Sequence, residues 1–141
     1  MAWKTFKQIV AYARNKEKEY KKTFRFTFTT NGMLLNDEIT DFLNQEMHNV
    51  VLSLDGRKKV HDYLRKTVNG KGSYNHIVPK FQEFVEKRGD KEYYVRGTYT
   101  HNNVDFTNDI FHIADLGFNE FPERILLPQA CEGCSPTIGG R

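Results

Sequence analysis

One apolar run that ends abruptly in small and charged residues constrains the fold of this chain more than any other feature. Asn49–Ser73 opens with three consecutive aliphatic residues, and Ser53, Asp55 and Gly56 follow at the end of the run. Arg65 comes later in the same segment. In α/β proteins, ligands collect outside the carboxyl ends of the strands. The segment therefore predicts a buried strand whose end faces a ligand site.

Helical and strand-like patterns alternate along the chain. Apolar residues recur at helical spacing in residues 2–21, 37–47, 73–87 and 107–116, and alternate with polar ones in residues 24–30, 49–55 and 92–100. Asn36 is expected to cap the second helix, and a long loop is expected before the third. Because proline is tolerated only in a first turn, Pro79 predicts that the regular third helix begins near it. This order predicts an α/β fold with parallel strands and right-handed crossovers.

Size and composition limit the class of protein. With 141 residues, 38% hydrophobic and 28% charged, the chain is one globular domain or a piece of one. The net charge of +3 is too small to indicate nucleic acid, and the basic residues 4–22 are interpreted as a solvated helix face, with a phosphate-binding patch as the alternative. No membrane span, signal peptide or disulfide framework is recognisable. We therefore expect a cytoplasmic protein with no nucleic-acid or membrane partner.

Polar groups at the ends of the expected strands are the first candidate site residues. An unpaired charge at the end of an apolar strand is costly, so Asp55 requires solvent or a partner. Ser53 and Asp55 could simply cap the following loop, which is the better interpretation if the segment stands alone. The chain has no Gly-x-Ser-x-Gly elbow, which argues against a hydrolytic serine. Arg96, in the third expected strand, requires an anion, either Asp55 or a ligand carboxylate.

Cysteines and histidines give weaker signals. Cys131 and Cys134 have a spacing that suits zinc or a redox pair, but no further ligands and no strand-to-helix context accompany them. We interpret them as incidental thiols of an irregular tail that begins at residue 122. The histidines lack ligand spacing, and His101, just after the third expected strand, is the one that could line a site.

Six short motifs, in this order, resemble a known family. They are Thr29–Leu35 (TTNGMLL), Leu52–Gly56 (LSLDG), His61–Arg65 (HDYLR), Asn69–Tyr74 (NGKGSY), Tyr94–Thr100 (YVRGTYT) and Asp115–Phe118 (DLGF). Together they resemble the radical SAM superfamily, in its SPASM-type branch that modifies peptides and proteins. Within that branch the likeness is to the maturases that form thioether cross-links in the SCIFF peptide. The resemblance runs from about residue 1 to residue 118.

This resemblance implies a partial (β/α) barrel that cleaves S-adenosylmethionine (AdoMet) reductively with an electron from a 4Fe-4S cluster. The resulting radical would abstract hydrogen from a peptide substrate, so the hard chemistry belongs to the cofactors. The family's AdoMet contacts fall on Ser53 and Arg65. With them, Asn31, Asp55 and Arg96 are expected to face the cofactor or the substrate. Two further residues are expected to bind substrate, Thr98 and His101.

The chain also departs from the family pattern. It has no Cys-x3-Cys-x2-Cys loop to hold the cluster and no Gly-Gly-Glu-Pro strand end for the methionine amino group. We therefore expect an internal fragment, with residues 1–121 as a partial barrel core and residues 122–141 as an irregular tail, inactive when alone. The alternatives are a non-catalytic half-barrel that binds AdoMet or a peptide, and an inactive gene remnant that associates through open sheet edges.

Overall fold

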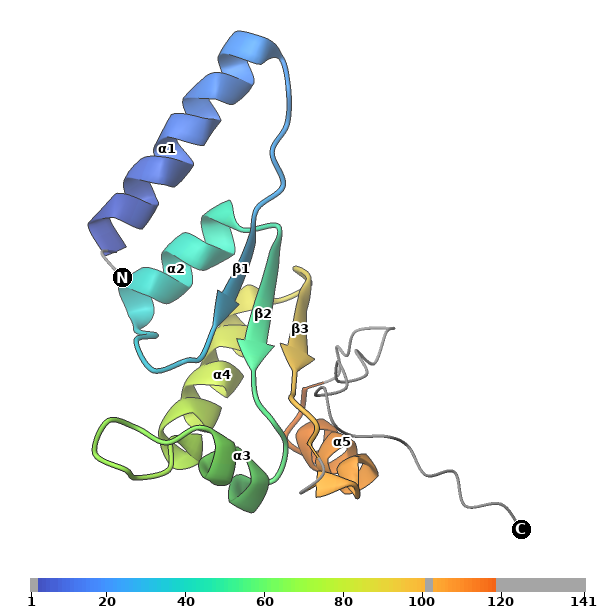
Figure 1. Ribbon diagram of the computed structural model, residues 1–141. Helices are drawn as coiled ribbons and strands as arrows, with labels where there is room; N and C mark the ends of the chain where they lie inside the picture. The colour runs from blue at the N-terminus through green and yellow to red at the C-terminus, as the bar shows by residue number, and fades with distance from the viewer. Residues whose placement is uncertain (1–2, 101–102, 119–141) are drawn as a thin grey trace, which may run out of the picture.

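The computed structural model describes residues 3–100 and 103–118. Its centre is a three-stranded parallel sheet in the order β1-β2-β3, with β2 in the middle. The strands are β1 (Thr27–Thr30), β2 (Asn49–Ser53) and β3 (Tyr93–Arg96), and the helices are α1 (Trp3–Tyr20), α2 (Asp37–Glu46), α3 (Lys58–Leu64), α4 (Tyr74–Arg88) and α5 (Phe106–Asp115). The α/β class, the parallel strands and the alternation of elements are thus confirmed (Figure 1).

Two features of the helices differ from the sequence prediction. The expected long loop contains α3, whose seven residues are too few to show a helical period in the sequence. The third expected helix starts at Tyr74 rather than near Pro79, which lies inside α4 without ending it. The Asp62 carboxylate accepts a hydrogen bond from the Tyr74 N–H at 2.8 Å and so satisfies one donor at the helix start. The buried apolar face of α4 then offsets the hydrogen bond that Pro79 cannot donate.

Helices α2 and α4 contribute their buried side chains to the core on one face of the sheet. In Figure 1, α4 lies behind the strands and α2 lies beside β1, while α3 and α5 lie beyond the arrowheads, at the carboxyl ends. The covered face carries the core, which includes Leu52, Val95, Phe81 and Phe84. Burial of such side chains stabilises the fold by about 1.5–3 kcal/mol each. The α2 helix is positioned as predicted, because the Asn36 side chain accepts a hydrogen bond from the Ile39 N–H.

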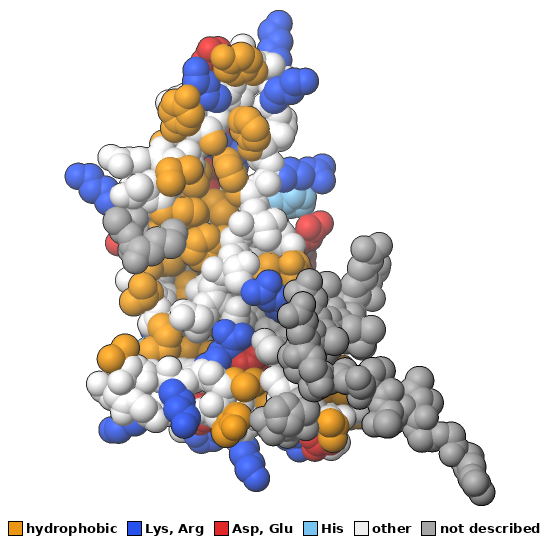
Figure 2. Space-filling view, viewed as in Figure 1, with side chains coloured by type: hydrophobic (Ala, Val, Ile, Leu, Met, Phe, Trp, Pro, Cys, Tyr) orange, Lys and Arg blue, Asp and Glu red, His pale blue; other side chains and the backbone are white. Residues whose placement is uncertain are grey.

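The opposite face of the sheet carries most of the polar strand residues. Side chains at paired positions of parallel strands share a face, so register places seven residues here, named the Ser53 face: Thr27, Thr29, Asn49, Val51, Ser53, Tyr94 and Arg96. Thr29 and Arg96 on the outer strands are exposed, whereas Ser53 in the central strand is 3% exposed. Hydrophobic side chains gather over α1 and along the adjoining edge of the sheet (Figure 2, seen from the same side as Figure 1).

Several sequence predictions concern residues 101–102 and 119–141, which lie outside the described residues; they include the irregular tail, the two cysteines and His101. Within the described ranges, none of the helices combines the length and the apolar character that a membrane crossing needs.

Candidate functional site

A pocket of about 410 Å³ lies at the carboxyl ends of β1 and β2 and contains two of the predicted site residues, Asn31 and Ser53. Its other lining residues are largely apolar: Trp3, Phe28, Thr29, Thr30, Leu34, Leu35 and Ile39. Pockets for small ligands typically have volumes of about 300–1,000 Å³ and combine apolar walls with a few polar groups. This pocket has both properties, and its position is the one expected for a ligand site of a parallel sheet.

The turn after β1 fixes the position of Asn31. Gly32 adopts φ +77°, and a Cβ at this residue would lie 2.6 Å from the Phe81 ring, so glycine is required for both conformation and space. The Asn31 Oδ1 accepts a hydrogen bond from the Met33 N–H at 3.2 Å, and the Thr30 hydroxyl accepts one from the Gly32 N–H at 3.0 Å. Because its oxygen closes the turn, Asn31 has its amide N–H groups left for a ligand.

A second group of predicted residues meets around Asp55, which is 1% exposed. The Arg65 guanidinium donates from Nη2 to Asp55 Oδ1 at 3.0 Å and from Nε to Oδ2 at 2.5 Å, a two-point ion pair. The Thr98 N–H also donates to Oδ1, at 2.8 Å. Asp55 is therefore occupied by protein groups, whereas Arg65, whose side chain is 32% exposed, has three guanidinium N–H groups left for a ligand.

Of the two partners predicted for Arg96, Asp55 is wrong, and a ligand carboxylate stays a prediction. Asp55 pairs with Arg65 instead, and the Arg96 side chain is exposed. The reason is that β3 ends at Arg96, so the chain beyond it turns toward Asp55 and presents the Thr98 backbone rather than a side chain. Arg96 nevertheless lies beside Ser53 in the sheet register, on the Ser53 face.

His61 is a site residue that the sequence reasoning missed. Its imidazole is fully buried and lies between the backbone N–H of Asp55, 3.3 Å from Nδ1, and the Ser73 hydroxyl, 3.0 Å from Nε2. Burial lowers the pKa of His61, although the nearby Asp55 carboxylate opposes the shift. The available signal was the spacing of His61 and Arg65, four residues apart, which places both on one face of a helix once α3 is recognised.

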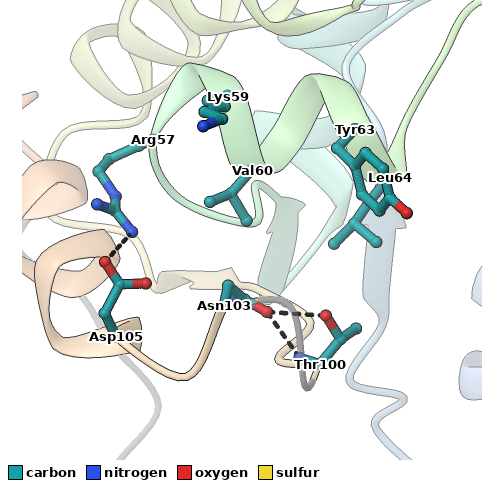
Figure 3. A pocket seen from close by; sticks show the side chains of 8 residues that line it. All are labelled: Arg57, Lys59, Val60, Tyr63, Leu64, Thr100, Asn103 and Asp105. Atoms are coloured by element: carbon teal, nitrogen blue, oxygen red, sulfur yellow. Dashed lines mark hydrogen bonds and ion pairs between the residues drawn. The ribbon is translucent and has the colours of Figure 1, made fainter.

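A larger hollow of about 680 Å³ lies between α3 and a wall formed by Thr100, Asn103 and Asp105. Figure 3 shows Arg57, Val60 and Tyr63 on the α3 side and Thr100, Asn103 and Asp105 opposite. Arg57 bridges the two walls, because its guanidinium donates to Asp105 Oδ2 at 2.8 Å and to Asp109 Oδ1 at 2.7 Å. These hydrogen bonds raise the pKa of Arg57. Neither Ser53 nor Arg65 lines this hollow.

The described residues contain no group of three or more His, Cys, Asp or Glu side chains that could hold a metal ion. They therefore do not fit a 4Fe-4S cluster, for which the sequence also has no ligand loop. The pocket at β1 and β2, in contrast, has the size of a site for a small organic ligand.

Comparison with solved structures identifies the fold. A structure of anSMEcpe with bound AdoMet matches with a TM-score of 0.74 and 21% identity, covering 85% of this chain and 32% of that chain. Native anSMEcpe with bound AdoMet and the Kp18Cys peptide matches with a TM-score of 0.73 and 21% identity, covering 85% and 33%. The chain thus has the fold of part of these enzymes, and its three-stranded parallel sheet with flanking helices corresponds to a partial radical SAM barrel.

Comparison with curated proteins gives two relatives. An uncharacterized protein of Synechocystis sp. (strain ATCC 27184 / PCC 6803 / Kazusa) is 33% identical over 102 residues, 68% of this chain and 25% of that protein. A cysteine-type anaerobic sulfatase-maturating enzyme of Clostridium novyi (strain NT) is 29% identical over 99 residues, 68% of this chain and 26% of that enzyme. No family model matches. The chain thus spans about a quarter of the length of these relatives.

Together the likenesses support the radical SAM superfamily to which the sequence motifs pointed. One of the relatives is a sulfatase-maturating enzyme, and the comparisons give no support to the SCIFF branch that the motifs resemble. That finer assignment stays a prediction.

Proposed function

We propose that this chain carries part of the AdoMet-binding wall of a radical SAM enzyme that modifies a peptide or protein. The observation that carries the proposal is the pocket at the carboxyl ends of β1 and β2, where Asn31 and the buried Ser53 lie among apolar residues. The fold similarity to anSMEcpe with bound AdoMet supports the same ligand. The peptide in a second anSMEcpe structure supports a peptide as the substrate class.

In this proposal the chain's residues bind and orient AdoMet. The Asn31 amide and the Ser53 hydroxyl would bind the ribose hydroxyls, because neutral donors and acceptors suit neutral partners. Arg65 would bind the methionine carboxylate with the guanidinium N–H groups that Asp55 does not use. Leu35 and Ile39 would cover the apolar parts of the ligand. AdoMet would supply a 5′-deoxyadenosyl radical, with release of methionine, only on receiving one electron from an iron–sulfur cluster, for which the described residues hold no ligands.

Several finer statements belong to the proposal as well. Thr98 and Arg96 would lie beside the substrate, because both are exposed near the ion pair of Asp55 and Arg65. Thioether cross-linking is the reaction that the sequence motifs favour, whereas the relative of Clostridium novyi favours maturation of a sulfatase. We also propose a cytoplasmic setting and catalytic inactivity of this chain alone.

Calorimetry with AdoMet on the full 141-residue chain tests the proposal. Asn31→Ala and Ser53→Ala should each weaken binding about fivefold, the effect of losing one neutral hydrogen bond. Thr107→Ala, an exposed change on α5, serves as the matched control and should leave the affinity unchanged. Absence of AdoMet binding by the folded wild-type chain, or equal affinities for all variants, would refute the assigned pocket.

A further inference from the structure

A buried histidine joins the backbone of the two residues that form the Arg65–Asp55 ion pair. His61 has no exposed surface, so no ligand can touch it. We propose that His61 is a positioning residue, which holds Arg65 in the orientation that the AdoMet carboxylate requires by linking the backbones of Asp55 and Arg65 through Ser73. This inference rests on the proposed function for its ligand, but the link itself follows from the geometry alone.

The hydrogen-bond partners of His61 determine its tautomer. A backbone N–H can only donate, so the Asp55 N–H, 3.3 Å away, makes Nδ1 the acceptor. The Ser73 hydroxyl donates its single hydrogen to the Arg65 carbonyl oxygen at 2.8 Å. Ser73 Oγ can therefore only accept from His61 Nε2, 3.0 Å away, which must carry the hydrogen. His61 is thus the neutral Nε2–H tautomer.

The resulting chain of hydrogen bonds runs from the Asp55 N–H through His61 and Ser73 to the Arg65 carbonyl. A further bond, from the Arg65 N–H to the His61 carbonyl at 2.8 Å, holds the same residue from its other backbone group. Arg65 follows α3 directly as its C-cap, with φ −120° and ψ 80°, so the helical ladder holds its N–H but not its carbonyl. The His61–Ser73 link holds the carbonyl, and thereby fixes the backbone from which the guanidinium reaches Asp55.

The surroundings of His61 favour the neutral ring. Asp55 Oδ2 lies 3.8 Å from Nδ1, too far for a hydrogen bond. From α3 and its end, Asp62 and Arg65 act on the ring with opposite signs. From α4, the Tyr74 ring packs edge-on with the two ring centres 6.0 Å apart. Protonation of Nδ1 would break the bond from the Asp55 N–H, so the link exists only with an uncharged imidazole.

Ser73 occupies the N-cap position of α4, yet it makes no capping bond there. Its hydroxyl is used by His61 and Arg65 instead, and the Asp62 carboxylate accepts from the Tyr74 N–H in its place. Serine is among the preferred capping residues, so this use of its hydroxyl is a departure from the local preference. The departure indicates that the structure uses Ser73 for the link to Arg65.

Nuclear magnetic resonance on the full-length chain tests the link without AdoMet. The wild-type ring at pH 7 should show the Nε2–H tautomer in long-range ¹⁵N spectra. A hydrogen on Nδ1, alone or together with Nε2, would overturn the proposal, and this readout requires no variant. Hydrogen exchange of the Arg65 Nε–H, bound to Asp55 in the wild type, is the second readout.

Matched variants then cut the link at one place or at two. His61→Asn keeps an acceptor near the position of the histidine Nδ1 but loses the Nε2 donor. It should therefore have the same effect as Ser73→Ala. In folded variants, exchange of the Arg65 Nε–H should be about tenfold faster and AdoMet affinity about fivefold to tenfold lower. Because both changes cut one link, the double variant should be no worse than either single variant. His76→Asn, an exposed change on α4, is the control.

The two proposals fail separately. Folded His61→Asn and Ser73→Ala proteins with wild-type exchange at Arg65, or with effects that add in the double variant, would overturn the positioning role. If the wild-type chain binds no AdoMet, the proposed function fails, whereas the tautomer and the Arg65 exchange still decide the role of His61.

Discussion

The Arg65 guanidinium holds the Asp55 carboxylate at two points, with Nη2–Oδ1 and Nε–Oδ2 distances of 3.0 and 2.5 Å. The pair is asymmetric, because the Asp55 side chain has no exposed surface and that of Arg65 is 32% exposed. Buried ion pairs require that each charge keep its partner, since an uncompensated buried charge is costly. The asymmetry decides which partner is more costly to remove.

Removal of Arg65 should therefore destabilise the fold more than neutralisation of Asp55. Arg65→Ala leaves a fully buried carboxylate and should lower the free energy of unfolding by about 3 kcal/mol. Asp55→Asn should lower it by about 1 kcal/mol, because the amide oxygen still accepts from the Thr98 N–H and Arg65 remains partly solvated. Urea unfolding followed by circular dichroism measures both. A larger loss for Asp55→Asn would contradict the burial asymmetry, and the double variant should cost less than the sum.

His61 should make the stability depend on pH in a defined range. Burial depresses its folded-state pKa below the ordinary 6.5, so the unfolded chain binds the proton first as the pH falls. The contribution of His61 is complete above pH 6.5 and is lost as the pH falls through the folded-state pKa. The free energy of unfolding should decrease in this range, by at most about 1.4 kcal/mol per pH unit for one proton.

His61→Gln provides the comparison for this pH effect, because glutamine does not titrate. Its stability should vary less than that of the wild type below pH 6.5. Burial opposes a low pKa for Asp62, but hydrogen bonds from Lys58 and the Tyr74 N–H lower it below 3.8, so its loss falls at more acidic pH. An identical pH dependence for wild type and His61→Gln from pH 6.5 down to the range in which Asp62 titrates would show that His61 is not buried in its neutral form.

Two glycines with positive φ should respond differently to alanine. Gly56 has φ +118°, and a Cβ there would lie 2.3 Å from the Asp109 Cβ, whereas Gly70, with φ +72°, has nothing within 4 Å. Gly70→Ala should cost only the left-handed conformation, about 1 kcal/mol. Gly56→Ala adds a collision with a buried side chain and should cost about 3 kcal/mol or more. Thermal unfolding compares the two, and equal losses would refute the close approach of α5 to the loop after β2.

Arg88 should be a strong contributor to stability despite lying near the end of a helix. It is 3% exposed, and its guanidinium donates to the Asn44 side chain and to the carbonyls of Glu92, Met47 and His48. Arg88→Ala leaves these acceptors without a donor and should lower the free energy of unfolding by about 3 kcal/mol.

The neighbouring Lys87 is the matched control for Arg88. Its ion pairs with Asp37 and Glu83 are exposed, so Lys87→Ala should change the stability little. AdoMet binding should be unaffected by either change, since neither residue lines the pocket. A loss of stability for Lys87→Ala as large as that for Arg88→Ala would show that the exposure of the two side chains does not determine their contributions to stability.

The sequence by itself determined the α/β class, the parallel order of the strands and the positions of Asn31 and Ser53 at strand ends, because hydrophobic periodicity and turn residues act locally along the chain. Only the tertiary structure decided the partner of Asp55, the burial of His61 and Arg88, and the use of Ser73 outside its capping position. The partner of Asp55, the burial of His61 and the use of Ser73 depend on where α3 packs against the start of α4, and a seven-residue helix leaves too short a pattern to predict. The burial of Arg88 depends on where the end of α4 meets the end of α2. Charges are satisfied by whatever partners the packing brings within reach, and sequence spacing does not contain that information.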